Sequence, residues 1–229
     1  MARPRRTAQQ TDLQEIIKET AWRQIAEFGA PTLSLRAIAR ELGITAPAIY
    51  NYFPRRDDLV TALIIDAYTS FGDSQLAARD AVPADELVGR VMATGLAYRQ
   101  WALDYPQRYQ LIFGTPIPGY TAPMTQVFPA AARSLGALVS VVEALRQAGK
   151  LNAADFPLVS PGYETAFAAW KSYGGEAELL SLSVAVLIWS HVHGLVSLEI
   201  AKNTPPFGMD GSDLYRYELN LICKQFIKA

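Results

Sequence analysis

The segment from Leu35 to Phe53, which reads LRAIARELGITAPAIYNYF, constrains the fold more than any other part of the chain. Gly43 interrupts its apolar pattern, and a glycine can take a positive φ without a Cβ clash, so the chain can turn sharply there. The pattern therefore predicts two short helices folded onto each other, which is a helix-turn-helix. The side chains expected to point inward between them are Ile38, Leu42, Ile44 and Ile49.

The second of these helices is expected over residues 46–52, with Thr45 as its N-cap and Pro47 in its first turn, where a missing N–H costs little. In a helix-turn-helix this element enters the DNA major groove. It carries no Arg, Lys or Gln, so base discrimination would rest on Asn51, on methyl contacts from Thr45 or Ala46, and on DNA shape. Its outward residues are Thr45, Ala46, Pro47, Ala48, Tyr50, Asn51 and Tyr52.

Residues 12–60 resemble the tetracycline-repressor (TetR) family of regulators. The resemblance rests on an Ala-Ile-Ala helix, a glycine turn, an aromatic run, and a basic residue before an acidic helix start. Tyr52 stands where the family commonly has His, and Arg56 where it commonly has Lys; both can still contact phosphate. The matching residues are Ala37-Ile38-Ala39, Gly43, Ile49-Tyr50-Asn51-Tyr52-Phe53, Arg56 and Asp57-Asp58-Leu59.

This resemblance implies that specific side chains bind an operator. Tyr50 and Tyr52 would donate hydrogen bonds to phosphates, and Arg56 would add a charge contact. Ser34 or Thr32 would anchor the helix that starts at residue 35 to the DNA backbone. With the outward residues above, the expected DNA-binding set in this region is Ser34, Thr45, Ala46, Pro47, Tyr50, Asn51, Tyr52 and Arg56.

Positive charge is concentrated at the extreme N-terminus, where Arg3, Arg5 and Arg6 precede the first acid, Asp12. Residues 1–60 carry nine Lys/Arg against seven Asp/Glu, whereas the net charge of the whole chain is −1, which argues against a generally basic nucleic-acid coat. Arg5 and Arg6 would reach flanking DNA, including its narrow minor groove. The alternative is that these terminal arginines are disordered and solvated.

The rest of the chain also reads as helical, because no alternating run of β-branched residues is bounded by turns. The expected fold class is all-α, with an N-terminal three-helix helix-turn-helix domain and a C-terminal helical bundle. We expect a flexible basic arm over residues 1–11, the DNA-binding domain over 12–56, and a ligand-binding and dimerisation domain over 57–229. Helices are expected over residues 12–28, 35–42, 46–52, 57–80, 87–106, 177–202 and 212–227. Another helix is expected to follow the proline- and glycine-rich stretch 114–123 and to end at Gly149.

The run Trp189-Ser-His-Val-His193-Gly194 is similar to the C-terminal domain of a TetR subgroup named for its Trp, His and Gly, and residues 98–113 fit it too. In such proteins this domain carries dimerisation and the ligand pocket. Aromatic residues at helical spacing are more often core than pocket, and a pocket lined by them would take a hydrophobic or aromatic effector with few charges. The candidates are Tyr98, Trp101, Tyr105, Tyr109, Phe113, Phe128, Phe167, Trp170, Trp189 and His193.

Two apolar seams alternate along residues 177–202, one starting at Leu182 and one at Leu180. One seam can close the domain's own core while the other meets a partner, so that four helices from two chains form a bundle. The alternative is that both seams are internal, but the paired half-sites of an inverted-repeat operator favour a homodimer. The expected interface is Leu182, Val186, Val196, Ile200, Tyr215, Leu219, Ile222 and Phe226.

Other classes of protein find no support. His191 and His193 lie about 200° apart around a helix, so they cannot chelate one metal ion together, and we expect His193 to be a hydrogen-bonded core residue on the face of Trp189. No nucleophile–base pair, metal set or phosphate loop indicates an enzyme, and no cofactor is expected. Cys223 is the only cysteine, which fits a reducing cytoplasm.

A membrane partner is not expected, and no signal peptide is visible. Leu179–Leu198 has no acidic or basic residue and could span a bilayer by length. It also contains serines and histidines, and a helix apolar on most sides can be buried in a core and an interface at once.

The sequence therefore predicts a ligand-responsive DNA-binding transcriptional regulator. We expect a repressor of double-stranded operator DNA that a small molecule releases, with activation left open. The ligand would favour a conformer whose two recognition helices are wrongly spaced for one DNA turn of about 34–36 Å. The alternative is a helical-bundle small-molecule or lipid-binding protein, or a bundle enzyme, whose helix-turn-helix does not bind DNA specifically.

Overall fold

The computed structural model describes residues 6–153, 165, 167, 168, 170–172, 177–203 and 211–228, with side chains from residue 13 onward. In this part of the chain all regular structure is helical, apart from one antiparallel bridge between Leu151 and Ile227. The all-α prediction is confirmed.

The chain divides into two compact units. The first comprises residues up to Ala67 together with Gln107–Val127, and the second comprises Tyr68–Pro106 and the residues from Phe128 onward. The sequence placed the boundary after residue 56. The structure differs because the division falls inside a continuous helix, and because a later segment of the chain packs into the first unit.

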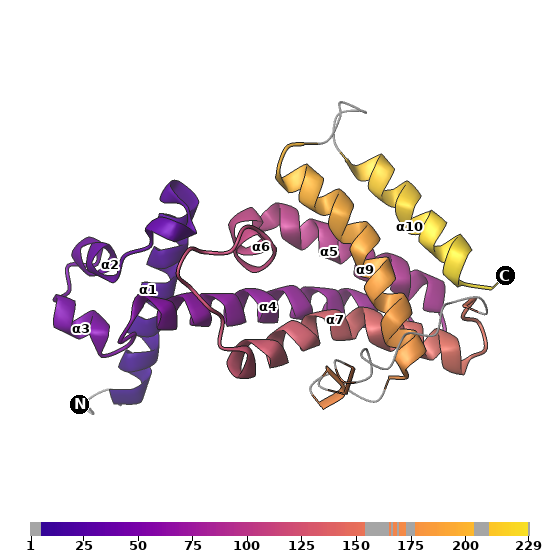
Figure 1. Ribbon diagram of the computed structural model, residues 1–229, viewed down its shortest axis with the longest axis horizontal. Helices are drawn as coiled ribbons and strands as arrows, with labels where there is room; N and C mark the ends of the chain where they lie inside the picture. Colours follow the sequence, from indigo (N-terminus) through magenta and orange to yellow (C-terminus); the bar gives the residue numbers. More distant parts are fainter. Residues whose placement is uncertain are drawn as a thin grey trace. The chain divides into compact units, whose positions relative to one another are not determined.

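Helices α1, α2 and α3 pack together in the first unit (Figure 1). Helix α1 begins at Arg6 rather than Asp12, so residues 6–11, expected in a flexible arm, are helical. Helix α6 was not predicted; it starts at Pro106, whose fixed φ suits a first helical position. The helices are α1 (Arg6–Phe28), the 3-10 turn η1 (Ala30–Thr32), α2 (Leu35–Glu41), α3 (Ala46–Tyr50), α4 (Arg56–Asp80), which continues into the second unit, and α6 (Pro106–Phe113).

The first unit has a continuous apolar core. Ile17 and Ala21 of α1 are fully buried, as their spacing predicts. Phe28 is 59% exposed, because it is the last residue of α1 and the chain turns away at Gly29, which has a φ of 82°. The core residues that α2, α3 and α4 supply include Ile38, Ile49, Leu59 and Leu63.

A buried ion pair joins α1 to the first half of α4. The Lys18 ammonium lies 2.6 Å from Asp66 Oδ2 and 2.8 Å from Glu15 Oε1, and Lys18 itself is only 8% exposed. Burial alone would lower the pKa of Lys18, but its hydrogen bonds to both carboxylates outweigh that effect and raise it. Lys18 therefore stays charged in the core.

The segment 107–127 is fastened to the first unit by side-chain contacts. The guanidinium of Arg108 lies 5.2 Å from the centre of the Trp22 ring, a cation–π distance. The Tyr120 hydroxyl shares a hydrogen bond of 2.9 Å with Thr61 Oγ1. Ile117 is buried. These contacts explain why this stretch belongs with the N-terminal helices.

In the second unit, α5, α9 and α10 pack against one another (Figure 1). The α5–α10 contact is close, because a Cβ on Gly95 would lie 2.5 Å from Leu219 Cδ2. Tyr215 donates a hydrogen bond of 2.6 Å to the Gly95 carbonyl. The helices of this unit, besides the second half of α4, are α5 (Leu87–Asp104), α7 (Met124–Gln147) from Phe128 onward, α9 (Leu179–Ile200) and α10 (Ser212–Phe226).

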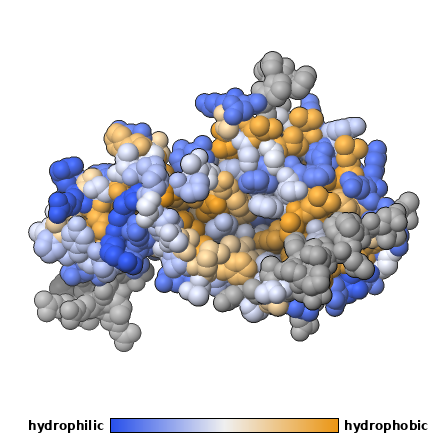
Figure 2. Space-filling view, viewed as in Figure 1, coloured by the Kyte–Doolittle hydropathy of each residue, from blue (hydrophilic) through white to orange (hydrophobic). Residues whose placement is uncertain are grey.

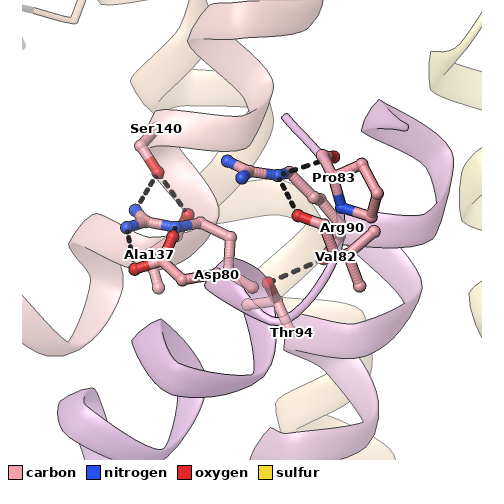
Figure 3. Close-up of polar contacts among 8 residues, drawn as sticks. Asp80, Val82, Pro83, Arg90, Thr94, Ala137 and Ser140 are labelled. Atoms are coloured by element: carbon pink, nitrogen blue, oxygen red, sulfur yellow. Dashed lines mark hydrogen bonds and ion pairs between the residues drawn. The ribbon is translucent and has the colours of Figure 1, made fainter. Parts of the chain in front are cut away.

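Figure 3 shows how polar contacts fix the turn between α4 and α5. At the end of α4, Arg79 binds Asp80 and also donates to Ser140 Oγ of α7 at 2.7 Å. From α5, Arg90 Nε donates to the carbonyls of Val82 and Pro83, both at 3.1 Å. The turn is therefore tied to both neighbouring helices.

Glu143 connects α7 to the start of α9. Its carboxylate accepts hydrogen bonds from Arg146 at 2.7 and 3.0 Å, from Ser181 Oγ at 2.7 Å and from the Glu178 backbone N–H at 3.2 Å. Its side chain is 12% exposed. The Arg146 guanidinium first, and these other donors with it, lower the pKa of Glu143 to about 2.

Helices α7 and α9 are long and apolar enough to cross a membrane by length and composition. Their most apolar windows are 50% and 44% buried inside the protein, respectively. Both helices thus bury much of their apolar surface against the rest of the chain.

Candidate DNA-binding surface and ligand-binding core

The turn between α2 and α3 has the geometry that its sequence predicts. Ser34 caps α2 by accepting a hydrogen bond from the Ala37 N–H at 3.4 Å. Gly43 has a φ of 66°, and the Ile44 N–H then bonds the Ala39 carbonyl at 3.0 Å. Of the four residues expected to point inward, Ile38 and Ile49 are fully buried, whereas Leu42 and Ile44 are partly exposed because they flank the turn itself.

Helix α3 presents a short outer face. Its inner side is anchored in the core by Ile49, which is fully buried, and Phe53, which follows the helix, is 3% exposed. Thr45 is its N-cap, although its side chain makes no cap hydrogen bond, and Asn51 is its C-cap. Among the predicted DNA-binding residues, Thr45, Pro47, Tyr50 and Asn51 are exposed, and Ala46 and Tyr52 are partly exposed.

Arg56, for which the resemblance implies a phosphate contact, is bound to backbone carbonyls in the structure. Its Nη2 donates to the carbonyl oxygens of Ala30 and Pro31 at 3.2 and 3.1 Å, which fastens η1 to the start of α4. Its side chain is 28% exposed. The Thr32 hydroxyl donates to the carbonyl oxygens of Phe28 and Gly29, although Thr32 itself is exposed.

The sequence analysis did not single out Arg55, an exposed residue that directly precedes α4. Its side chain is 76% exposed and makes a two-nitrogen contact with Asp58, at 3.2 Å from Nε and 2.7 Å from Nη2. The spacing of an arginine three residues before an acid at a helix start could have indicated this pair. Arg5 lies outside the described residues, and so does the side chain of Arg6.

An aromatic cluster lies in the core of the second unit. The Phe71 ring lies 4.8 Å from both the Tyr98 and the Trp101 rings, measured between centroids. Trp101 Nε1 donates to Ser70 Oγ at 3.0 Å. Tyr98 and Trp101, two of the predicted pocket residues, are both buried.

His193 is the hydrogen-bonded residue that the sequence predicts. Its Nδ1 lies 2.9 Å from the Tyr98 hydroxyl and its Nε2 lies 3.3 Å from Ser197 Oγ, while its ring packs on Trp189 with centroids 4.8 Å apart. Burial lowers the pKa of His193. His191 points elsewhere and pairs with Glu218 at 2.9 Å. The described residues contain no cluster of three or more side chains that could hold a metal ion.

The other pocket candidates do not form one group. Tyr109 and Phe113, whose ring centroids lie 5.1 Å apart, belong to the first unit, because α6 packs there. Tyr105 is 42% exposed, and Phe128 and Phe167 are partly exposed. Trp170 is buried, and its indole N–H finds no acceptor among the described residues.

A surface groove of about 380 Å³ in the second unit lies between α5 and α10. Leu96, Arg99 and Tyr215 are among the residues that line it, and none of the predicted pocket residues does. Arg99 is held there by two hydrogen bonds to Glu199, at 2.6 and 2.8 Å. The groove is thus separate from the aromatic cluster.

Most of the residues predicted for the dimer interface face their own unit. In α10, Tyr215, Leu219, Ile222 and Phe226 are at most 4% exposed, because this stripe packs inside the chain, where Tyr215 and Leu219 meet α5. In α9, Leu182 and Val196 are buried as well, whereas Val186 and Ile200 are partly exposed. The periodicity identified a buried stripe correctly but assigned it to the wrong neighbour.

A different apolar surface is open on these two helices, which we call the outer face of α9 and α10. Figure 2 shows hydrophobic residues gathered over this part of the molecule. Leu214, Tyr217 and Leu221 follow one another at helical spacing on α10. The residues of the outer face, with their exposed fractions, are Leu198 (45%), Leu214 (45%), Tyr217 (61%) and Leu221 (38%).

Helix α2 is capped by Ser34, a glycine turn follows it, and α3 is exposed on one side. This arrangement defines a helix-turn-helix DNA-binding protein. Comparison with known families agrees. The family described as bacterial regulatory proteins, tetR family, matches residues 17–63, and the family described as tetracyclin repressor-like, C-terminal domain, matches residues 91–221. The chain belongs to the TetR family of transcriptional regulators.

Individual relatives support this assignment. The chain is 35% identical over 198 residues to the HTH-type transcriptional regulator Mb1846 of Mycobacterium bovis, covering 86% of this chain and 82% of that one. The crystal structure of the regulatory protein SCO4313 superposes with a TM-score of 0.76 at 35% identity, over 96% of this chain and 98% of that one. Both relatives carry the name of a regulatory protein.

A more distant likeness shows the fold alone. The structure of the SmeT–triclosan complex matches with a TM-score of 0.61 at 14% identity, over 94% of this chain and 91% of SmeT. The arrangement of helices is therefore shared well beyond recognisable sequence similarity.

Proposed function

We propose that this regulator represses transcription in the cytoplasm by binding an inverted-repeat operator as a homodimer, with α3 in the major groove. One observation carries the proposal: Thr45, Pro47, Tyr50 and Asn51 are exposed together on α3 while Ile49 is fully buried beneath them. An exposed, anchored recognition helix is what readout of base edges and phosphates requires.

The test is fluorescence anisotropy with duplex DNA from the promoter upstream of the protein's own gene, measured across a salt series. Salt-sensitive binding with a footprint of two chains supports the proposal. Asn51→Ala should reduce affinity for the specific duplex by about 1–3 kcal/mol and leave binding to unrelated DNA nearly unchanged. Equal loss on both duplexes would count against base readout by Asn51.

We assign the dimer contact to the outer face of α9 and α10. Exposed apolar side chains that gather on one surface commonly mark an interface, and a two-fold contact would place the same surface of both chains together. Leu221→Glu combined with Leu214→Glu should give a monomer in sedimentation equilibrium. Val88→Glu, at a 49% exposed position on α5, is the matched control and should remain dimeric.

For the effector we propose a hydrophobic or aromatic small molecule with a hydrogen-bond acceptor. The aromatic cluster of the second unit would supply apolar contacts. Trp170 is a separate candidate contact, and its buried N–H, which has no acceptor among the described residues, would donate to an acceptor on the ligand. SmeT, which shares the fold, is found in complex with a small molecule, triclosan. Trp170→Phe should weaken effector binding more than it weakens the fold, as measured by titration calorimetry and thermal unfolding.

Release of the operator would follow from a population shift. The effector would favour a conformer that cannot place both copies of α3 on the operator, and α4, which is shared by the two units, would carry the change. Linkage requires that DNA weaken effector binding by the same factor as the effector weakens DNA binding. An effector that binds tightly but leaves operator affinity unchanged would refute this mechanism.

A further inference from the structure

We propose that Arg55, and not Arg56, supplies the phosphate contact at the start of α4. The inference rests on the proposed operator binding and names a residue for it. It differs from what the resemblance to the family implies, which is a phosphate contact by Arg56. In this chain Arg56 binds backbone carbonyls, whereas Arg55 is exposed.

Arg56 is committed to the inside of the first unit. Its Nη2 is shared between the carbonyl oxygens of Ala30 and Pro31, and its Nε is buried without an acceptor among the described residues. With Nη2 bound to both carbonyls and Nε buried, this guanidinium can offer a phosphate only its Nη1 donors, which lie 3.9 Å from Asp57 Oδ1, on a side chain that is 28% exposed.

Arg55 has the opposite surroundings. Its side chain is 76% exposed, and Asp58 holds it at three points, through the backbone N–H at 2.9 Å, Nε at 3.2 Å and Nη2 at 2.7 Å. A guanidinium has five N–H donors, so this contact leaves the two on Nη1 and the second on Nη2 available. The side chain is therefore held in one orientation with donors still available for an anion.

The position of Arg55 along the chain suits a contact to the phosphate backbone of DNA. It follows the C-cap of α3, Asn51, by four residues, and the buried Phe53 anchors the loop between them. Contacts to phosphates beside the recognition helix set its register in the groove. Because the Arg55 fork is already ordered by Asp58, little side-chain entropy is lost when a phosphate binds.

The experiment compares the salt dependence of binding to the promoter duplex for three variants. Arg55→Ala should lower the slope of log K against log salt by about 0.9 per phosphate contact, and so by about 2 in a dimer. Arg56→Ala should lower the melting temperature while changing the slope little. Arg23→Ala is the matched control, because Arg23 is also exposed (60%) and paired with an acid, Glu41, and it should change neither.

A second comparison separates contact from general charge. Asp58→Asn removes the carboxylate that orders the Arg55 fork. Losing one negative charge favours DNA binding in either background, so the gain in operator affinity should be smaller when Arg55 is present than in the Arg55→Ala background. An Arg55→Ala slope equal to that of Arg23→Ala, or a slope change found in Arg56→Ala instead, would overturn the assignment. If the unmodified protein showed no salt-dependent DNA binding, the proposed function itself would fail, and this assignment with it.

Discussion

Replacing Glu143 by Gln tests how α7 is held to the start of α9. Arg146, Ser181 and the Glu178 N–H all donate to this carboxylate, and together they lower its pKa from 4.5 to about 2. A shift of that size corresponds to about 3 kcal/mol of stabilisation by the ionised form. Because Arg146 is 36% exposed and glutamine keeps some of the hydrogen bonds, we expect a loss of about 1–3 kcal/mol at pH 7.

The sign of the pH dependence follows from the lowered pKa. The stabilisation is fully present above pH 4.5, the ordinary pKa of the group, and is lost as the pH falls towards about 2. Unfolding in urea at fixed protein concentration, measured for both proteins at several pH values between 7 and 2.5, gives the difference directly. Glu27→Gln, at an exposed position of α1, is the control. A difference between wild type and Glu143→Gln that stays constant down to pH 2.5 would refute the argument.

Three further substitutions test other parts of the fold. Gly43→Ala should cost about 1–2 kcal/mol in urea unfolding because of the φ of 66° alone, since nothing lies within 4 Å of the added Cβ, and Gly43→Asn should recover part of it. Lys18→Met should lower the melting temperature by a few degrees, because Asp66 loses its partner but is 39% exposed and can be rehydrated; an unchanged melting temperature would show that the pair contributes nothing. Tyr98→Phe removes the hydrogen bond to His193 and should cost about 1 kcal/mol in urea unfolding, and a stabilised variant would contradict the bond.

The helix-turn-helix was predictable because its determinants are local. Gly43 permits the turn, Ser34 caps α2, and Ile38 and Ile49 are spaced to meet across it, so a short stretch of sequence contains the necessary information. The boundaries of α9 and α10 were also predicted within a few residues, because a sequence rich in proline and glycine lies between the two helices.

What failed was the choice of neighbour for a correctly identified face. The spacing of Tyr215 and Leu219 shows that this side of α10 is buried, but not that α5 covers it, because periodicity carries no information on the partner. Arg56 is a similar case. Its residue type matches a phosphate contact, yet the carbonyls of Ala30 and Pro31, far away in sequence, capture it.

The return of residues 107–127 to the first unit has a consequence for engineering. DNA specificity can be exchanged between related regulators by joining the N-terminal part of one gene to the C-terminal part of another. This strategy assumes that the DNA-binding unit is one continuous stretch of sequence. Here a crossover placed after Ala67 would separate Trp22 from Arg108 and Thr61 from Tyr120. A functional chimera of this protein should therefore take two segments from the same parent, the residues up to Ala67 and residues Gln107–Val127.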